Sequence, residues 1–492
     1  MFSFDNTYAR ELQGFYVACL PTATLQPRLL RLNRALAEEL GLRLDGLDDE
    51  RLAAVFSGNE LPDGAASLAQ AYAGHQFGGF SPQLGDGRAL LLGEVIDRHG
   101  QRRDVAFKGS GKTPFSRRGD GKAAVGPVLR EYVLGEAMHA LGVPTTRALA
   151  AVATGERVFR ERVLPGAVLT RIAASHVRVG TFEYFAAQGD HDRVRQLADY
   201  AIARHYPQLI DHPNRYLELL RAVADRQAAL IAQWMLVGFI HGVMNTDNMA
   251  ISGETIDYGP CAFMEAFNPR AVFSSIDQGG RYAYGNQPAI AQWNLTRFAE
   301  TLLTCIDPES PDGAIPAATD VLEAFPFRYQ GHWLAGARAK LGIGPGADED
   351  GDFALANDWL ALLFAQSVDY TLAWRRLGDA AEGNVTPLAA LFADGTALSA
   401  WLDRWSARCA AEATTSPGGR ALAMRRANPI YIPRNHVVEE ALTAASDDGD
   451  LNPFDRLVDV LLRPFDERPG LQHYATPAPP AVTASYRTFC GT

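Results

Sequence analysis

The sequence predicts an α+β protein of two lobes, with a strand-rich first part and a mostly helical second part. Apolar runs at 88–96 and 103–108 flank the turn signal DRHG and indicate paired strands, and 166–173 indicates another strand. From residue 181 onward, long segments with the helical period prevail. Strands followed by helices favour two packed units with a cleft between them, and we expect the boundary near Ala174.

Turn and cap signals place the individual elements. A helix is predicted at 28–41, where Gly41 ends it, and another begins at Gly126-Pro127, because proline suits the first helical position. The run 146–163 predicts a hairpin around Thr154-Gly155-Glu156. Further helices are predicted at 181–206, 216–240, 353–376 and 454–463.

A chain of 492 residues is longer than one small core needs, so two or three domains, or one large two-lobed unit, are expected. We divide it into an N-terminal extension at 1–80 that packs on the lobes, an N-lobe at 81–174 and a C-lobe at 175–492. The C-lobe includes a C-terminal extension.

Charge and cysteine content exclude several classes of protein. The net charge of −11 argues against general binding to nucleic acid or to anionic membranes. Five cysteines without a CxxC motif fit a reducing compartment better than a disulfide scaffold. The N-terminus lacks the pattern of a secretory signal, and the apolar run 228–240 is too short to span a bilayer. We therefore expect a cytoplasmic protein with no membrane partner.

The segment HGVMNTDNMAISGETIDYGP (241–260) carries the most suggestive polar residues. If 249–251 pairs with Thr255-Ile256 across a tight turn, Asn248 and Asp257 become neighbours. An amide oxygen and a carboxylate side by side suit Mg²⁺ or Mn²⁺, and Asp247 could then accept a proton from an attacking hydroxyl. The alternative is that these residues only form a turn and a strand end.

A second motif places a lysine at the end of an apolar strand, in Asp104-Val105-Ala106-Phe107-Lys108. Protein kinases use a strand lysine of the V-A-I-K type, paired with a helix glutamate, to hold ATP phosphates. The following helix offers Glu131 and Glu136, which point about 140° apart, so we expect one of them to face Lys108. Each residue taken alone could be an ordinary surface charge.

Glycines and arginines add a possible phosphate site. Leu84-Gly85-Asp86-Gly87-Arg88 precedes the first of the paired strands, but the third glycine of the kinase pattern is replaced by Leu90. Arg171 and Arg178 are further cations whose forked geometry suits phosphate oxygens, although each could equally be a surface ion-pair partner. The string Gly109–Thr113 resembles the end of a P-loop, but the first glycine of that motif is missing and no helix is expected to follow.

The chain resembles the selenoprotein O family, called YdiU in bacteria. The resemblance is carried by AYAGHQFGGFSPQLGDGRA, FKGSGKTPFSRRGDGKA, HGVMNTDNM with IDYGP, and ANPIYIPRNH, and it runs through nearly the whole chain. It implies a bilobal protein-kinase-like fold and transfer of AMP, rather than phosphate, from ATP to protein hydroxyls. It also implies that ATP binds in a flipped orientation, with its terminal phosphates buried and its α-phosphate facing the acceptor.

The resemblance also assigns roles to residues. Lys108 pairs with Glu131, Asp247 is the catalytic base, and Asn248 and Asp257 bind the Mg²⁺ or Mn²⁺ ion. Contacts with ATP are implied for Gly85, Gly87, Arg88, Lys108, Asp120, Gly121, Arg171, Arg178 and Asp257. Eukaryotic relatives end in Cys-x-x-selenocysteine, whereas this chain ends at Cys490-Gly491-Thr492. This difference puts intrinsic dithiol chemistry at the C-terminus in doubt. A redox role stays open for Cys490 and Cys261.

Three functions compete at this point. The first is transfer of AMP, or of UMP from UTP, to Ser, Thr or Tyr hydroxyls of protein substrates. The second is a phosphotransferase acting on a protein or small molecule, which the Lys108 and Asp257 elements alone would permit. The third is a catalytically silent ATP-binding scaffold.

Overall fold

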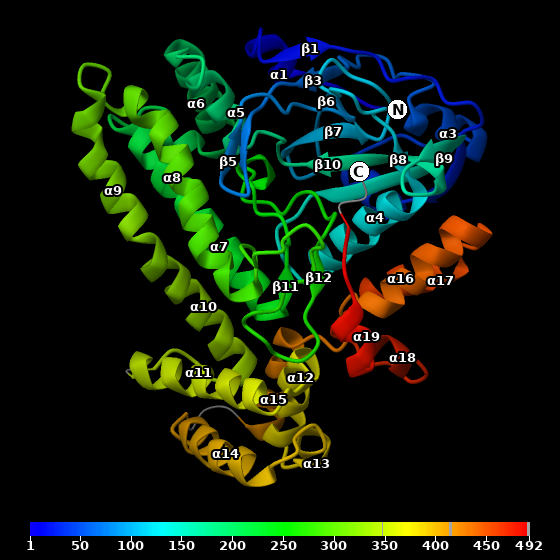
Figure 1. Cartoon of the computed structure of the whole chain (residues 1–492). Helices are drawn as coiled ribbons and strands as arrows, with labels where there is room; N and C mark the ends of the chain where they lie inside the picture. The colour runs from blue at the N-terminus through cyan, green and yellow to red at the C-terminus, as the bar shows by residue number, and fades with distance from the viewer. Residues whose placement is uncertain (347, 413–415, 490–492) are drawn as a thin grey trace.

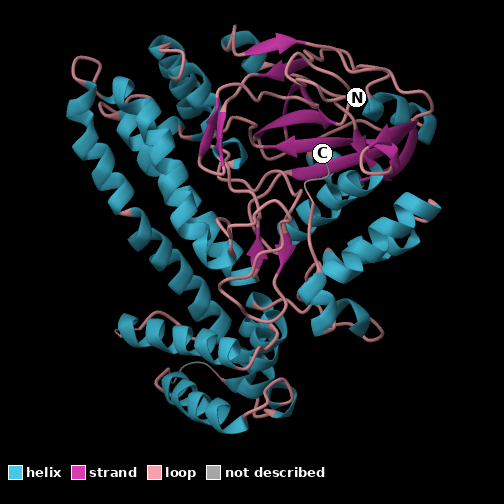
Figure 2. Ribbon diagram, viewed as in Figure 1, coloured by secondary structure: helices cyan, strands magenta, loops and turns pink. Residues whose placement is uncertain are grey.

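The computed structural model describes residues 1–346, 348–412 and 416–489. It combines helices with one large antiparallel sheet and two small strand pairs (Figures 1 and 2). The strands are β1 (Tyr16–Ala18), β2 (Arg28–Leu32), β3 (Leu68–Gln70), β4 (Gly74–Gln76), β5 (Gly79–Ser81), β6 (Ala89–Ile96), β7 (Arg102–Lys108), β8 (Ala123–Ala124), β9 (Arg147–Phe159), β10 (Val163–Ala173), β11 (Phe239–Ile240) and β12 (Ala262–Phe263).

Helices dominate the chain after residue 178, as the sequence predicts, but the helices predicted at 181–206 and 353–376 are each divided in two, with breaks at 187–190 and 366–369. The α-helices are α1 (Thr7–Glu11), α2 (Arg34–Glu39), α3 (Asp49–Ser57), α4 (Val125–Ala140), α5 (Val179–Ala186), α6 (His191–His205), α7 (Arg215–Val237), α8 (Gln287–Ile306), α9 (Ile315–Glu323), α10 (Phe325–Leu341), α11 (Glu349–Ala365), α12 (Tyr370–Ala381), α13 (Thr386–Ala389), α14 (Gly395–Ala410), α15 (Pro417–Ala427), α16 (Asn435–Thr443), α17 (Asn452–Leu461), α18 (Gln472–Ala475) and α19 (Pro480–Ser485). In the part of the chain that the structure covers, none of these helices combines the length and the apolar character that crossing a bilayer requires.

The large sheet has the order β1-β3-β6-β7-β10-β9-β2, and β8 pairs with β10. Its first and last strands come from the N-terminal eighty residues, so that segment is built into the sheet. The central trio β6, β7 and β10 sets Lys108 between Ala89 and Leu169 on the neighbouring strands. Helix α4 packs against β9 and β10, and this brings its glutamates toward the sheet (Figure 1).

The expected hairpin around Thr154-Gly155-Glu156 is wrong. β9 runs through this position as one strand, and the chain reverses later, at 160–162, where the amide of Arg160 donates to the carbonyl of Arg162 at 3.1 Å. Gly155 has a φ of +73°, and the register with β10 shifts close to its partner residues. The glycine is thus absorbed as an irregularity in the strand, because β10 is long enough to pair on both sides of it.

The helix predicted at 28–41 is only partly correct. Residues 28–32 form the edge strand β2, which pairs with β9, and the helix is confined to Arg34–Glu39. Asn33 separates the two elements, because its side chain accepts a hydrogen bond from the amide of Leu36 and caps the helix. Gly41 follows the helix with a φ of +70°, as expected for a helix stop.

The hairpin expected between 249–251 and Thr255-Ile256 does not form either. Ala250 bridges Arg178 and Thr255 bridges Thr145, so each side of the turn pairs with a different part of the chain. The reason is that 174–179 and the turn after α4 offer unpaired backbone groups on either side of this segment. The chain nevertheless reverses between its two ends, with the amide of Gly253 bonded to the carbonyl of Ala250 at 3.1 Å.

Candidate functional site

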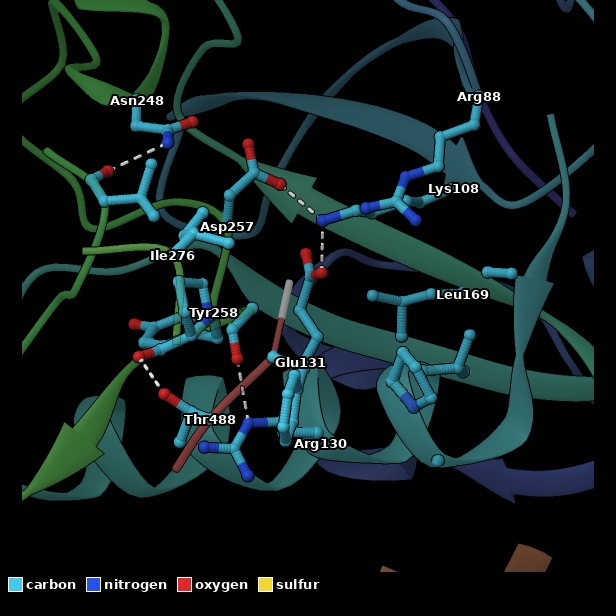
Figure 3. Close-up of a pocket in the computed structure, with 18 of the residues that line it drawn as sticks. Arg88, Lys108, Arg130, Glu131, Leu169, Asn248, Asp257, Tyr258, Ile276 and Thr488 are labelled. Carbon is cyan, nitrogen blue, oxygen red and sulfur yellow. Dashed lines mark hydrogen bonds and ion pairs between the residues drawn. The ribbon is translucent and has the colours of Figure 1, made fainter. Parts of the chain in front are cut away.

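A cavity of about 1140 Å³ lies between the central strands of the sheet and the helical part of the molecule. Its wall is formed by β6, β7, β10, the start of α4, the loop 243–260, helix α16 and the C-terminal segment 482–489. Most of the residues singled out from the sequence converge here, namely Gly87, Arg88, Lys108, Glu131, Arg171, Arg178, Asp247, Asn248 and Asp257. Figure 3 shows the centre of this wall.

Lys108 is the centre of a charge cluster. Its Nζ lies 2.5 Å from Oε2 of Glu131 and also forms an ion pair with Asp257 (Figure 3). Arg171 bridges the same two carboxylates, at 3.1 Å from Glu131 Oε1 and 2.8 Å from Asp257 Oδ1. Arg178 completes the group at 3.6 Å from Asp257 Oδ2. Three cations thus surround two carboxylates, and together they offer several donors that suit phosphate oxygens.

Asp257 is held ionised by these neighbours. Burial raises the pKa of its carboxyl, but attraction to Lys108, Arg171 and Arg178 outweighs burial and holds this pKa well below the usual value. Its backbone has a φ of +65°, an unusual conformation for a residue other than glycine. Such backbone strain is frequent at functional sites, where the surrounding contacts maintain it.

The two glutamates of α4 have different partners. Glu131 faces Lys108, whereas Glu136 binds Arg147 at 2.7 Å and accepts a hydrogen bond from Asn33 at 2.8 Å. Their separation of five residues places them on different faces of the helix, and only Glu131 reaches the cavity.

A buried chain of hydrogen-bonded polar side chains orients the guanidinium of Arg171. Its Nε donates to Nε2 of His176 at 3.1 Å, and Nδ1 of His176 lies 2.9 Å from Asp104, which pairs with Arg204 at 2.5 Å. Burial lowers the pKa of His176 to about 4, so the ring is neutral and accepts at Nε2 while Nδ1 donates. The Arg171 guanidinium is therefore fixed before any ligand arrives.

Asp247 lines the same cavity and adjoins the charge cluster through Arg178. Its Oδ2 accepts from Nε2 of Gln76 at 3.3 Å, while Oδ1 has no hydrogen-bond partner within the described residues. Burial raises the pKa of Asp247 to about 6, although Arg178 opposes the shift. Arg178 also donates to the backbone carbonyl of Asp247 at 3.0 Å and so holds the loop in place. A carboxylate with this pKa can serve as a general base near neutral pH.

Asn248 and Asp257 provide oxygen atoms that fit a divalent metal ion. The Asn248 amide nitrogen donates to the carbonyl of Val243 at 2.9 Å, which leaves its side-chain oxygen on the side of Asp257 (Figure 3). Oδ1 of Asp257 is shared by Lys108 and Arg171, so Oδ2 is the more accessible oxygen. Within the described residues, no group of three or more His, Cys, Asp and Glu side chains forms a full protein cage. Mg²⁺ needs few protein ligands, because water and phosphate complete its shell.

The remaining residues for which ATP contacts were predicted do not all reach the cavity. Arg88 and Gly87 line the cavity, and Figure 3 shows Arg88 reaching down beside Lys108. Gly85 lies behind the cavity wall, where an added Cβ would lie 2.3 Å from the ring of Phe115.

Asp120 and Gly121 lie outside the cavity wall, in the loop between β7 and β8. Asp120 pairs there with Arg160 at 2.8 Å. Gly121 packs so closely on Gly111 that an added Cβ would lie 2.0 Å from its carbonyl oxygen.

Two cavity residues were missed by the sequence reasoning. Asp86 is buried between Gly85 and Gly87, and burial raises its pKa to about 6. Its position inside the glycine-rich string was a usable signal. Tyr72 lies under the guanidinium of Arg178, whose Cζ is 4.5 Å from the ring centre, and only the tertiary fold brings these two together.

Of the two cysteines with an open redox role, Cys261 is fully buried. Its thiol lies 3.4 Å from the carbonyl of Tyr258, and burial raises its pKa to about 11, which disfavours the reactive thiolate. Cys490 lies outside the described residues.

Comparison with known proteins decides the family. The family described as Protein adenylyltransferase SelO matches residues 2–462. The chain belongs to this family. It is 64% identical over 472 residues to a protein of Chromobacterium violaceum named "Protein nucleotidyltransferase YdiU", which covers 96% of this chain and 98% of that protein. Proteins of the same name from Cereibacter sphaeroides and Rhizobium etli are 63% and 58% identical over the whole of this chain. Members of the SelO family are protein adenylyltransferases, so AMP transfer to proteins is the activity of the chain.

Proposed function

We propose that the protein transfers AMP from ATP to Ser, Thr or Tyr hydroxyls of its protein substrates and releases pyrophosphate. The observation that carries this proposal is a group of cations next to a carboxylate of raised pKa in one cavity. Lys108, Arg171 and Arg178 gather around Asp257. Asp247, whose pKa burial raises to about 6, adjoins this group through Arg178.

This arrangement favours one orientation of ATP. The β- and γ-phosphates carry most of the negative charge and suit the group of Lys108, Arg171 and Arg178, and Arg88 lines the same cavity. The α-phosphorus then lies nearer to Asp247. In the reaction, Asp247 accepts the proton of the acceptor hydroxyl, the hydroxyl oxygen bonds to the α-phosphorus, and the bond from the α-phosphorus to the bridging oxygen breaks. The cations stabilise the charge that develops on the departing pyrophosphate.

Asn248 and Asp257 would hold the Mg²⁺ or Mn²⁺ ion. When bound, such an ion neutralises phosphate charge and orients the phosphates for displacement. Glu131 keeps Lys108 directed into the cavity, and the neutral His176 keeps Arg171 directed toward Asp257.

The remaining assignments follow from the same proposal. Gly85, Gly87, Arg88, Asp120 and Gly121 contact the nucleotide. For Gly85 this requires the segment before β6 to shift, and for Asp120 and Gly121 it requires the loop between β7 and β8 to move toward the cavity. The fold corresponds to a kinase-like pair of lobes, 81–174 and 175–492; the segment 1–80, expected to pack on the lobes, also adds β1, β2 and β3 to the sheet of the first lobe. We also propose a cytoplasmic location, where ATP is available.

Isotopic labelling tests the reaction class. With α-labelled ATP, a divalent metal and casein as a hydroxyl-rich acceptor, we expect label on the protein and an equal amount of pyrophosphate. With γ-labelled ATP we expect no label. Label from the γ position with ADP as product would instead establish a phosphotransferase, and ATP binding without transfer would indicate a scaffold. Replacing ATP with UTP in the same assay measures the nucleotide preference.

A further inference from the structure

The hairpin made by β4 and β5 (Gly74–Ser81) stands apart from the large sheet and is attached to the loop 243–248, which carries Asp247 and is called the catalytic loop below. It pairs only within itself among the described strands, and β5 lies next to the helical half of the molecule (Figure 1). Its turn residues Phe77 and Gly78 have φ values of +52° and +85°, as a tight two-residue hairpin requires. The hairpin therefore reaches from the N-terminal eighty residues to the side of the cavity that holds Asp247.

Three consecutive residues of the catalytic loop are bonded to this hairpin. The amide of Phe77 donates to the side-chain oxygen of Asn245 at 3.1 Å, and the amide of His75 donates to Oγ1 of Thr246 at 2.7 Å. The side chain of Gln76 donates to Oδ2 of Asp247 at 3.3 Å. The hairpin thus fixes the loop residue by residue.

A buried carboxylate reinforces the attachment. Glu183 on α5 lies 2.5 Å from Nδ1 of His75 through one oxygen and accepts from Oγ1 of Thr246 at 2.5 Å through the other. Gly74 packs so closely on the loop that an added Cβ would lie 2.7 Å from Oδ1 of Asp247. The position of the Asp247 carboxylate is consequently set by the hairpin on both of its oxygens.

The tip of the hairpin continues into the cavity. Phe77 lines it and is 40% exposed, and Ile276 lines it from the helical half and is 47% exposed. Phe77 follows Gln76, whose side chain donates to Asp247, and all three residues line the cavity, so an acceptor hydroxyl bound at Asp247 lies close to this apolar tip. Exposed apolar side chains in a cavity wall suit the side chains of a peptide better than free phosphate or sugar.

We propose that the β4–β5 hairpin is the acceptor side of the active site. Gln76 is a positioning residue that holds the Asp247 carboxylate toward the acceptor hydroxyl, and Phe77 contacts the protein segment that carries this hydroxyl. The proposal rests on the AMP-transfer function and specifies how that site takes its protein substrate.

The test of Gln76 uses the full-length protein, α-labelled ATP with metal, and casein as acceptor. Gln76→Met keeps the length of the side chain and removes the hydrogen-bond donor, and we expect kcat to fall about 10- to 100-fold, since hydrogen bonds to charged groups are of that strength. The Kd for ATP should stay within about 2-fold of wild type. Gln76→Glu, which is isosteric but cannot donate when ionised, should show the same fall, and Gln76→Arg, which can donate, should recover part of the rate.

Phe77→Asn tests the tip, because asparagine tolerates the positive φ of the turn and lacks the ring. We expect KM for casein to rise about 10-fold while the Kd for ATP does not change. The matched controls are Gln188→Met in the exposed turn after α5 and Phe327→Asn, whose side chain is 76% exposed on α10. Both should behave as wild type.

Each outcome has a separate meaning. A wild-type protein that transfers no AMP would overturn the proposed function, and this inference with it. A wild-type protein that transfers AMP while Gln76→Met retains full kcat, or while both hairpin variants lose ATP binding, would overturn the inference alone. In the second case the hairpin only supports the fold.

Discussion

Replacing Asp247 with asparagine removes the proton acceptor and preserves the surrounding contacts. The amide oxygen of asparagine can still accept from Gln76, and Arg178 still binds the backbone carbonyl of residue 247. We therefore expect kcat to fall by about 10²- to 10⁴-fold, which corresponds to about 3–5 kcal/mol of transition-state stabilisation, with ATP binding retained. Steady-state transfer from α-labelled ATP measures the rate, and equilibrium binding of ATP provides the control.

The same substitution should increase stability at neutral pH. Burial raises the pKa of Asp247 to about 6 in the folded protein, against 3.8 for an ordinary aspartate. The folded state thus binds more protons than the unfolded state between these values, and stability falls as the pH rises through that window. Above pH 6 the buried charge costs up to about 3 kcal/mol, from the difference between the two pKa values. Asp247→Asn removes that cost, so its midpoint of urea unfolding at pH 7.5 should equal or exceed that of wild type.

The pH dependence separates a proton acceptor from a merely structural aspartate. For wild type, kcat/KM should fall about tenfold per pH unit below about pH 6, because this ratio reports ionisations of the free enzyme. The residual activity of Asp247→Asn should lack this acidic limb. If the variant retained a rate within threefold of wild type, or lost activity together with folding stability, the reasoning would be refuted.

Three further predictions follow from buried charges. Asp257→Ala should abolish transfer and greatly weaken metal-dependent nucleotide binding, since it removes the proposed metal ligand and the partner of three cations. Calorimetric titration with ATP and metal checks this, and normal activity in a folded variant would remove the metal assignment. Glu131→Gln should lower kcat/KM by about 10-fold or more, because Lys108 is left with one carboxylate. Glu131→Asp should retain more activity than Glu131→Gln. Equal rates for wild type and both variants would contradict the role of the Lys108–Glu131 ion pair. Burial lowers the pKa of Lys340 to about 7 from 10.5, so the unfolded state binds more protons between these values and stability rises with pH across that window. Lys340→Met should therefore stabilise the protein by up to about 5 kcal/mol at pH 7 and below, and this gain in unfolding free energy should vanish toward pH 10.5. Urea unfolding at several pH values measures it. A gain in unfolding free energy that did not depend on pH would exclude this explanation.

Some parts of the site were predictable because they depend on short stretches of chain. An apolar strand that ends in Lys108, followed by a helix with two glutamates, is a local pattern, and the structure places it as expected. The same holds for Asn248 and Asp257, which line one cavity although the hairpin proposed between them does not form. Chain reversal within ten residues was sufficient to bring them together, whichever segments supplied the hydrogen bonds.

Other features could not be read from local pattern. Whether Gly155 reverses the chain or is absorbed in a long strand depends on the length of β10, its partner. Residues 28–32 have a helical apolar period but form a strand, because β9 offers a free edge that an isolated segment cannot anticipate.

By itself, the sequence determined the family, the order of strand-rich and helix-rich parts, and the residue types that carry the chemistry. These depend on composition, on short motifs and on apolar period, all of which act over a few residues. Only the tertiary structure decided that Glu131 and not Glu136 meets Lys108, that Asp247 is buried enough for its pKa to rise, and that Gln76 reaches the catalytic loop. Contacts over 171 residues of chain, like that of Gln76 with Asp247, result from the packing of whole elements, and no local pattern encodes them.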